Sequence, residues 1–169
     1  MEVLKVIKGR RSIRSFRRDP IPDEHLRTVL EAGIWAPSGG NAQPWEFIVV
    51  RDKPTIERIR LFSPGLFGEP DALVIACVNE ERVKKGGKAE ELVAIMDVSM
   101  AVQNIMLAAY SLGIGSCPIV SFNKTAVKEL LELPTHVNPV IMVSLGYPDK
   151  WPNPPRRRPL EEVVHHERY

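Results

Sequence analysis

Two arginine clusters in this sequence have side chains suited to binding a phosphate group. The first, Arg10-Arg11-Ser12-Ile13-Arg14, places three guanidinium groups and a hydroxyl within five consecutive residues, and the second, Arg156-Arg157-Arg158, lies near the C-terminus. Guanidinium groups make paired, charge-assisted hydrogen bonds to phosphate oxygens, and a serine hydroxyl adds a further one. Runs of charge are also typical of solvated surfaces, so the clusters alone leave both interpretations open.

The net charge of +2 is distributed unevenly. Residues 1–18 contain seven Lys or Arg and one acid, a net charge of +6, so the rest of the chain carries −4. Basic ends on a mildly acidic body favour a small anionic ligand over a nucleic acid, because no nucleic-acid-binding motif is recognisable. We therefore expect no nucleic-acid partner.

A second loop with polar chemistry spans residues 36–43. Its Ser38-Gly39-Gly40-Asn41 core is too polar and flexible to predict a regular element. The loop leads into Trp45-Glu46-Phe47-Ile48-Val49-Val50, which predicts a strand, and we assign Trp45 to the hydrophobic core.

The elements that must position these loops follow from apolar spacing and turn residues. Helices are predicted over 2–9, 24–34, 55–61 and 124–131, the last capped by Asn123, and strands over 72–78, 114–119 and 139–146. The charged segment 79–91 predicts a solvated helix or loop with a turn at Gly86-Gly87-Lys88. Proline-rich residues 151–159 predict an extended arm, and residues 160–165 a short strand that could join a partner subunit.

Residues 92–112 predict the longest helix, because sixteen of these twenty-one residues are apolar. Asp97 lies near its middle, and a carboxylate at the centre of a bilayer costs about 2.5–3.5 kcal/mol, so we expect no membrane association. A helix apolar nearly all round is buried, and one small sheet covers only one of its sides. The uncovered side predicts a homodimer.

With 169 residues and 44% hydrophobic content, the chain predicts a single domain over 1–169, with 150–169 reaching toward a partner subunit. The N-terminal residues lack the apolar run of a signal peptide, so a cytoplasmic location is expected. Cys77 and Cys117 have no CxxC spacing and predict buried thiols. His165 and His166 lack further ligands nearby, and no metal site is predicted.

Four segments together resemble the nitroreductase family of FMN-dependent oxidoreductases. RRSIRSF and APSGGNAQPWEFIVV match the family's R-x-S-x-R/K loop and its P-S-x-x-N-x-Q-P-W segment. DVSMAVQNIMLAAYSLGIGSC, residues 97–117, is similar to its long dimer-core helix and the glycine-rich turn that follows. Gly146-Tyr147-Pro148 and the later RRRPLEEVV resemble its C-terminal arm. The segments occur in the family's order over nearly the whole chain.

The resemblance implies an α+β fold of the α/β-sandwich type, with a central, mostly antiparallel sheet flanked by helices and a dimer that exchanges C-terminal arms. It implies an FMN-dependent enzyme that passes hydride from NADH or NADPH, through flavin N5, to a nitroaromatic, quinone or similar small-molecule acceptor. Because the flavin carries the chemistry, no catalytic residue is assigned.

The resemblance also assigns residues to the flavin. Arg10 and Ser12 would hold the phosphate together with Arg157, and Arg11 would contribute through its backbone or side chain. Arg14 would lie beside the N1–C2=O edge, where a guanidinium stabilises the negative charge of reduced flavin. Pro37, Ser38 and Gly39 would approach the flavin from the other subunit, with Asn41 and Gln43 supporting the ring edge or the loop. Pro118 and Ile119 would pack on the opposite face of the ring.

Several alternatives stay open at this point. Arg156 and Arg158 either contact FMN or are solvated neighbours of Arg157, and the N–H that faces flavin N5 belongs to residues 39–41 or to residues 120–121. The chain is short between Phe47 and Asp97, where larger members carry helices over the substrate pocket, so a more open pocket is expected. A specialised dehalogenase, a flavin-consuming oxidase and a non-catalytic flavin-binding protein are the alternative functions.

Overall fold

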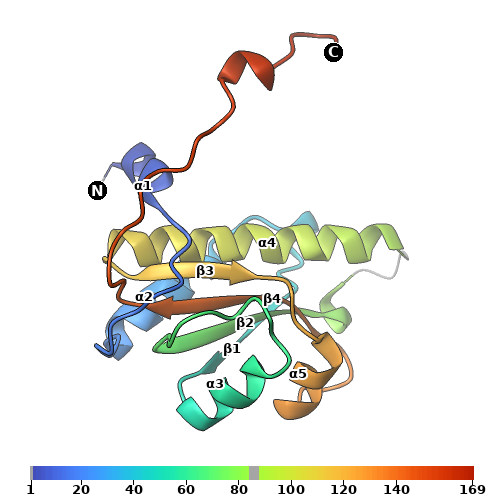
Figure 1. Ribbon diagram of the computed structural model, residues 1–169. Helices are drawn as coiled ribbons and strands as arrows, with labels where there is room; N and C mark the ends of the chain where they lie inside the picture. Colours follow the sequence, from blue (N-terminus) through green and yellow to red (C-terminus); the bar gives the residue numbers. More distant parts are fainter. Residues whose placement is uncertain (1, 84–87) are drawn as a thin grey trace.

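The computed structural model describes residues 2–83 and 88–169. Its centre is a four-stranded antiparallel sheet with the strand order β1-β2-β4-β3 and helices on both faces (Figure 1). The strands are β1 (Trp45–Val50), β2 (Ala72–Asn79), β3 (Gly115–Ile119) and β4 (Val137–Gly146). The predicted α+β sandwich with an antiparallel sheet is confirmed.

Strand β2 lies inside the sheet, and its alternate side chains enter two separate cores. Ala72, Val74 and Ala76 pack with residues of α2 (Asp23–Ile34) and α4 (Lys88–Ser111). Leu73 and Ile75 pack with residues of α3 (Lys53–Arg60) and α5 (Lys124–Leu130). Burial on both faces explains why this strand is an unbroken apolar run in the sequence.

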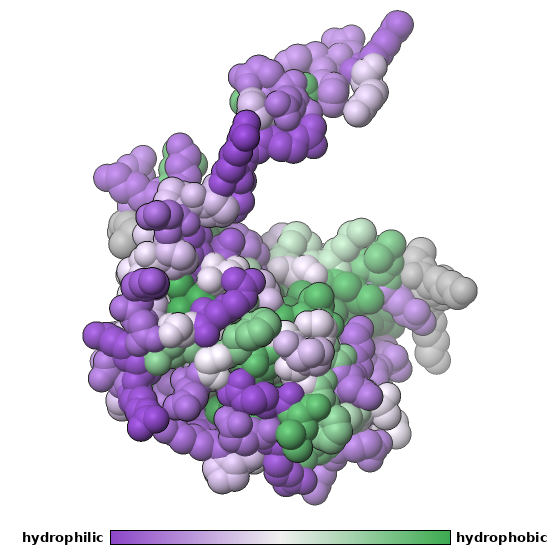
Figure 2. Space-filling model, in the orientation of Figure 1, coloured by the Kyte–Doolittle hydropathy of each residue, from purple (hydrophilic) through white to green (hydrophobic). Residues whose placement is uncertain are grey.

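Helix α4 is buried along one side and exposed along the other. Val98 and Ile105 are fully buried in the core, and Asn104 Nδ2 donates a hydrogen bond of 3.2 Å to the carbonyl of Ala32 in α2. The opposite side of its N-terminal half exposes Leu92, Val93, Ile95, Met96 and Met100. Figure 2 shows this apolar surface toward the N-terminal end of the helix. Within one chain this apolar helix is thus covered on one side and uncovered on the other, as the sequence predicts.

By length and composition, Glu90–Ser111 is apolar enough to cross a membrane. The core helix of a soluble protein passes the same test, and this helix packs against α2 and the sheet. The composition of α4 thus reflects its place in the core and its exposed apolar side.

The two ends of the chain meet at the C-terminal end of α4. Helix α1 (Val3–Gly9) packs there, with Gly9 against the ring of Tyr110, and Trp151 contacts the same ring edge-to-face at 5.0 Å between centroids. Beyond Trp151 the chain leaves the body as an exposed arm (Figure 1). A 3-10 turn, η3 (Leu160–Glu162), replaces the predicted strand, because the arm carries this segment away from the sheet of its own chain (Figure 1).

Smaller differences from prediction occur in the loops. Gly39–Asn41 forms a 3-10 turn, η1, within the segment predicted to be irregular, and Glu80–Arg82 forms another, η2. The helix predicted at 55–61 begins earlier, at Lys53, because Asp52 accepts the N–H of Thr55 and caps it. Of the turn predicted at 86–88, residues 86 and 87 lie outside the described residues.

Candidate functional site

The arginine loop lies along the outer edge of β3. The Ile13 N–H donates to the carbonyl of Ser116 at 2.9 Å, and Ser12 and Ser116 form a parallel β-bridge. Ile13 is buried against Gly115, where an added Cβ would lie 2.7 Å from Ile13 Cγ1. The sheet edge and this glycine therefore fix the backbone of residues 12–13.

Two guanidinium nitrogens of the loop are buried without a hydrogen-bond partner among the described residues, namely Arg10 Nη1 and Arg11 Nε. Buried polar groups almost always have a partner, and a charged donor without one is costly. Arg11 is otherwise engaged, because its Nη1 donates to the carbonyls of Lys8 at 2.7 Å and Arg10 at 2.8 Å, at the end of α1. Arg10 is thus the better candidate for an external anion.

Three side chains of the arginine loop lie close to Cys117 in β3. Burial raises the pKa of the Cys117 thiol, and this rise is opposed by the charge of Arg14, a hydrogen bond from Ser12 and the charge of Arg10. All three groups thus lie close enough to act on that sulfur, and Pro118 and Ile119 follow it along the strand. The structure brings the predicted phosphate loop and the predicted ring-contacting segment together.

A rigid apolar loop borders this cationic site, which the sequence reasoning missed. Arg60 Nη2 donates to the carbonyl of Gly68 at 2.7 Å, and Gly68 itself lies against the backbone of Arg14. On the other side, the Asn123 N–H donates to the carbonyl of Phe62 at 2.8 Å. Exposed apolar side chains on this loop and beside it are Leu61, Phe62, Phe67 and Val120. For Leu61, Phe62 and Phe67 the signal in the sequence was a position in or beside a Pro/Gly-rich segment, and for Val120 there was none.

Within the second predicted loop, residues 36–43, the backbone has several positive φ angles and is held by hydrogen bonds. Gly40, Asn41 and Gln43 have positive φ angles of 58°, 57° and 49°. Ser38 Oγ accepts the N–H of Gln43 at 3.0 Å, and the Gly39 N–H donates to the Asp97 carboxylate at 3.1 Å. Non-glycine residues in this region persist only where their surroundings hold them.

The two predicted halves of the site lie apart within one chain. The loop around Gly39 contacts α4 at Asp97, whereas the arginine loop follows α1, which packs at Tyr110. From Asp97 to Tyr110 the helix rises about 20 Å at 1.5 Å per residue. Single-chain geometry therefore does not bring Gly39, Asn41 or Gln43 to Arg10.

The C-terminal arginines are also separated from the loop. Residues 156–158 are exposed on the arm that leaves the body (Figure 1). Arg158 pairs locally with the Glu162 carboxylate at 3.3 Å, while Arg157 Nη1 makes only a 3.5 Å contact with the carbonyl of Arg156 among the described residues. One chain thus does not bring Arg157 to Arg10 and Ser12.

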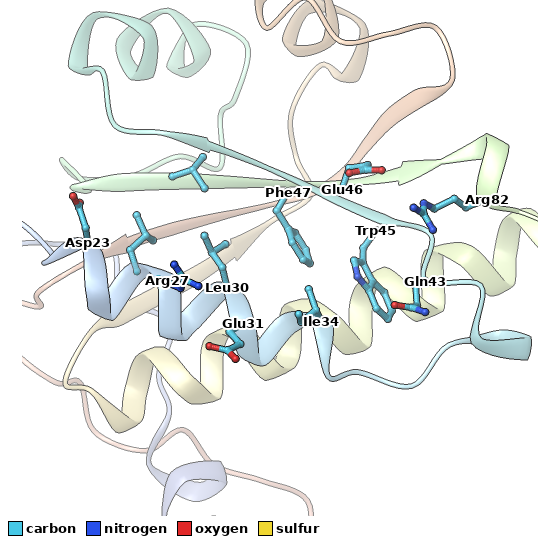
Figure 3. Close-up of a pocket in the computed structure, with 12 residues that line it drawn as sticks. Asp23, Arg27, Leu30, Glu31, Ile34, Gln43, Trp45, Glu46, Phe47 and Arg82 are labelled. Atoms are coloured by element: carbon cyan, nitrogen blue, oxygen red, sulfur yellow. The ribbon is translucent and has the colours of Figure 1, made fainter.

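An open groove of about 800 Å³ lies between α2 and β1 (Figure 3). Leu30 and Ile34 of α2 and Trp45 and Phe47 of β1 point into it. Strand β1 ends the sheet, and among the described residues no strand pairs with its outer edge, whereas the arginine loop covers the edge of β3. Charged lining residues are Asp23, Arg27, Glu31, Glu46 and Arg82.

Comparisons with known sequences and structures bear on the family and the fold. The sequence profile described as "Nitroreductase family" matches residues 7–66 and 60–147. The chain is 32% identical over 185 residues to "FMN reductase [NAD(P)H]" of Bacillus subtilis, covering 99% of this chain and 74% of that protein. It is 31% identical over 186 residues to "NADH dehydrogenase" of Thermus thermophilus, covering 92% and 91%. A crystal structure of a nitroreductase family protein from Clostridium difficile superposes with a TM-score of 0.89 at 27% identity, covering 100% of both chains.

Proposed function

The chain belongs to the nitroreductase family, and from this premise we propose that it is an FMN-dependent NAD(P)H oxidoreductase whose site is completed by a second copy of the chain. Bound FMN would supply the two-electron chemistry, taking hydride from the nicotinamide and giving it to the acceptor. The protein's own part is to bind, orient and supply charge.

The observation that carries the proposal is the buried Arg10 Nη1, two residues before Ser12, which has no hydrogen-bond partner among the residues that the structure describes. A phosphate monoester offers three acceptor oxygens, so it satisfies that donor and the Ser12 hydroxyl together. The residues present therefore fit the phosphate of FMN. Arg11 would contribute mainly by holding the end of α1, because its Nη1 is already engaged with carbonyls there.

The remaining residues of the site suit an isoalloxazine ring. The Arg14 side chain is exposed close to Cys117, where its charge would stabilise negative charge on a reduced ring. Pro118, which is exposed on β3, would pack on one face of that ring, whereas the side chain of Ile119, predicted to lie there too, is buried in the core with Leu73 and Ile75. The exposed apolar side chains of Phe62, Phe67 and Val120 nearby support an acceptor with a flat, apolar body, such as a nitroaromatic or a quinone.

A homodimer accounts for the three features left open in one chain. The exposed apolar side of α4 would pair with its counterpart, which places loop 37–43 of the partner subunit at the flavin. The arm, residues 150–169, would cross to the other subunit, so that Arg157 of the partner subunit reaches the phosphate. The outer edge of β1, which pairs with no strand among the described residues, and the apolar groove beside it would bind the segment around Val163 and Val164 of the partner subunit.

The test is to load the purified protein with FMN and to record its absorbance under anaerobic conditions before and after adding NADH or NADPH. We expect a yellow protein whose flavin absorbance bleaches with at least one nicotinamide. A protein that does not take up FMN, or whose bound flavin neither nicotinamide reduces, would falsify the proposal. Sedimentation should show a dimer, and a flavin-loaded monomer would contradict the shared site.

A further inference from the structure

Asp97 is a carboxylate buried within an otherwise apolar part of α4. Asp97 is 3% exposed, and its helix neighbours Ala94, Val98 and Ala101 are buried in the core. Burying an ionised carboxylate is costly unless hydrogen bonds replace the lost water. Burying Asp97 at this position therefore costs free energy of folding, and its contacts should explain why a carboxylate is there.

The Asp97 carboxylate receives one hydrogen-bond donor among the described residues. The Gly39 N–H lies 3.1 Å from Oδ2 and 3.3 Å from Oδ1. A carboxylate can accept several donors, and buried charges with few partners stabilise a fold less than apolar side chains of similar volume do. Core stability thus does not account for Asp97, whereas the loop that it holds does.

Gly39 belongs to the strained loop of residues 38–43. Hydrogen bonds within the loop, such as the one from the Gln43 N–H to Ser38 Oγ, hold its shape. Among the side-chain hydrogen bonds of the described residues, the bond from the Gly39 N–H to Asp97 connects the loop to the core. The backbone of residues 39–41 is exposed, so it is held in shape while it faces outward.

The loop also lies beside the exposed apolar side of α4. Val93, one turn before Asp97, contacts the Cα side of Gly39 so closely that an added Cβ would lie 2.9 Å from Val93 Cγ1. Val93, Met96 and Met100 belong to the surface that the proposed function assigns to the dimer. A loop fixed at that border can meet a ligand bound by the other subunit without losing conformational freedom on binding.

We propose that Asp97 is a positioning residue, which fixes loop 38–43 in the shape that receives FMN from the partner subunit. This inference rests on the proposed function. Asp97 does not touch the cofactor; it acts through the N–H of Gly39. The position of its oxygen matters in this role, and its charge does not.

Three variants separate position from charge. Asp97→Asn keeps an acceptor oxygen in place without the charge, Asp97→Glu keeps the charge but moves the oxygens by one methylene, and Asp97→Ala removes both. We expect the FMN dissociation constant of Asp97→Asn to stay within about threefold of wild type, and those of Asp97→Glu and Asp97→Ala to rise about tenfold, equal to about 1.4 kcal/mol. Near-normal affinity in Asp97→Glu with a loss in Asp97→Asn would overturn the positional role.

Asn104→Ala is the matched control, because Asn104 ties the same helix to α2 through the carbonyl of Ala32 and lies away from the loop. It should lower the thermal unfolding midpoint of the FMN-free protein and leave FMN affinity within about twofold of wild type. Equal losses of affinity in Asn104→Ala and Asp97→Ala would mean a general effect of stability and would overturn the inference.

The inference and the proposed function can fail separately. If wild type binds FMN and Arg10→Ala weakens that binding, but Asp97→Ala and Asp97→Glu both bind like wild type, the positioning role is wrong and the proposed function stands. If wild type takes up no FMN, the proposed function fails and the inference fails with it. Should Asp97→Ala not fold, the comparison of Asp97→Asn with Asp97→Glu still decides.

Discussion

Replacing Arg10 with alanine tests the phosphate assignment at its most specific atom. Arg10 Nη1 is buried and has no hydrogen-bond partner among the described residues. The variant loses no hydrogen bond of that nitrogen and removes a buried donor without a partner among the described residues, so the FMN-free protein should be about as stable as wild type. The effect should be on ligand binding alone.

The size of the effect follows from the kind of bond that is removed. A hydrogen bond to a charged group contributes about 1.5–3 kcal/mol, and each 1.4 kcal/mol is tenfold in affinity. The FMN dissociation constant of Arg10→Ala should therefore rise by about 10- to 150-fold. Shielding of this nitrogen from water places the expected value in the upper part of that range.

The assay titrates FMN-free protein with FMN and, separately, with riboflavin, which has the same ring and no phosphate. Arg10→Ala should weaken the binding of FMN and leave that of riboflavin unchanged. Arg18→Ala is the control, because it removes the same charge from the same basic segment, where Arg18 makes only an exposed pair with Glu69 at 3.6 Å. Arg18→Ala should alter neither affinity beyond about twofold.

Two results would refute this reasoning. Equal weakening of FMN and riboflavin by Arg10→Ala would show that the arginine acts on the ring or on the fold. Unchanged FMN affinity would place the phosphate elsewhere.

The other predictions concern the C-terminal arm, the contact between Gly115 and Ile13, and the buried Cys77 thiol. Arg157→Ala should weaken FMN binding about tenfold or more without affecting riboflavin, measured by the same titrations. Deleting residues 151–169 should convert a dimer into a weaker dimer or a monomer in sedimentation. Gly115→Ala should lower the free energy of unfolding in urea by about 1–3 kcal/mol, because its Cβ would lie 2.7 Å from Ile13 Cγ1. Burial raises the pKa of Cys77 from 9.0 to about 12, so above pH 9.0 the unfolded thiol ionises while the folded one stays protonated. Stability should fall as the pH rises through this window, and less steeply in Cys77→Ala, as measured by urea unfolding.

Local signals in the sequence were sufficient for most elements of the fold. The strand at Trp45–Val50 was predicted with its observed bounds, because a polar loop precedes it and an apolar run defines it. Asn123 was predicted to cap the helix that follows, and its Oδ1 accepts the N–H of Ala126 at 3.0 Å. Capping and side-chain periodicity depend on neighbours in the sequence, so both are visible there.

Features that depend on distant residues were not visible. The strand predicted at 160–165 is a 3-10 turn in one chain, because a strand needs a neighbouring edge. That Asp97 holds Gly39 could not be predicted, since the sequence shows no partner for a carboxylate in an apolar helix. The hydrogen bond of Arg11 to the carbonyl of Lys8 at the end of α1 could not be predicted either, because the sequence does not show which of two adjacent arginines bonds to the backbone.

The most direct test of the shared flavin site is a crystal structure of the FMN-loaded protein. We predict the FMN phosphate within hydrogen-bond distance of Arg10 and Ser12 of one subunit and of Arg157 of the partner subunit, with the ring beside Arg14. Loop 37–43 near the ring should belong to the partner subunit. A phosphate bound away from Arg10, or a flavin site built from a single chain, would contradict the proposed architecture.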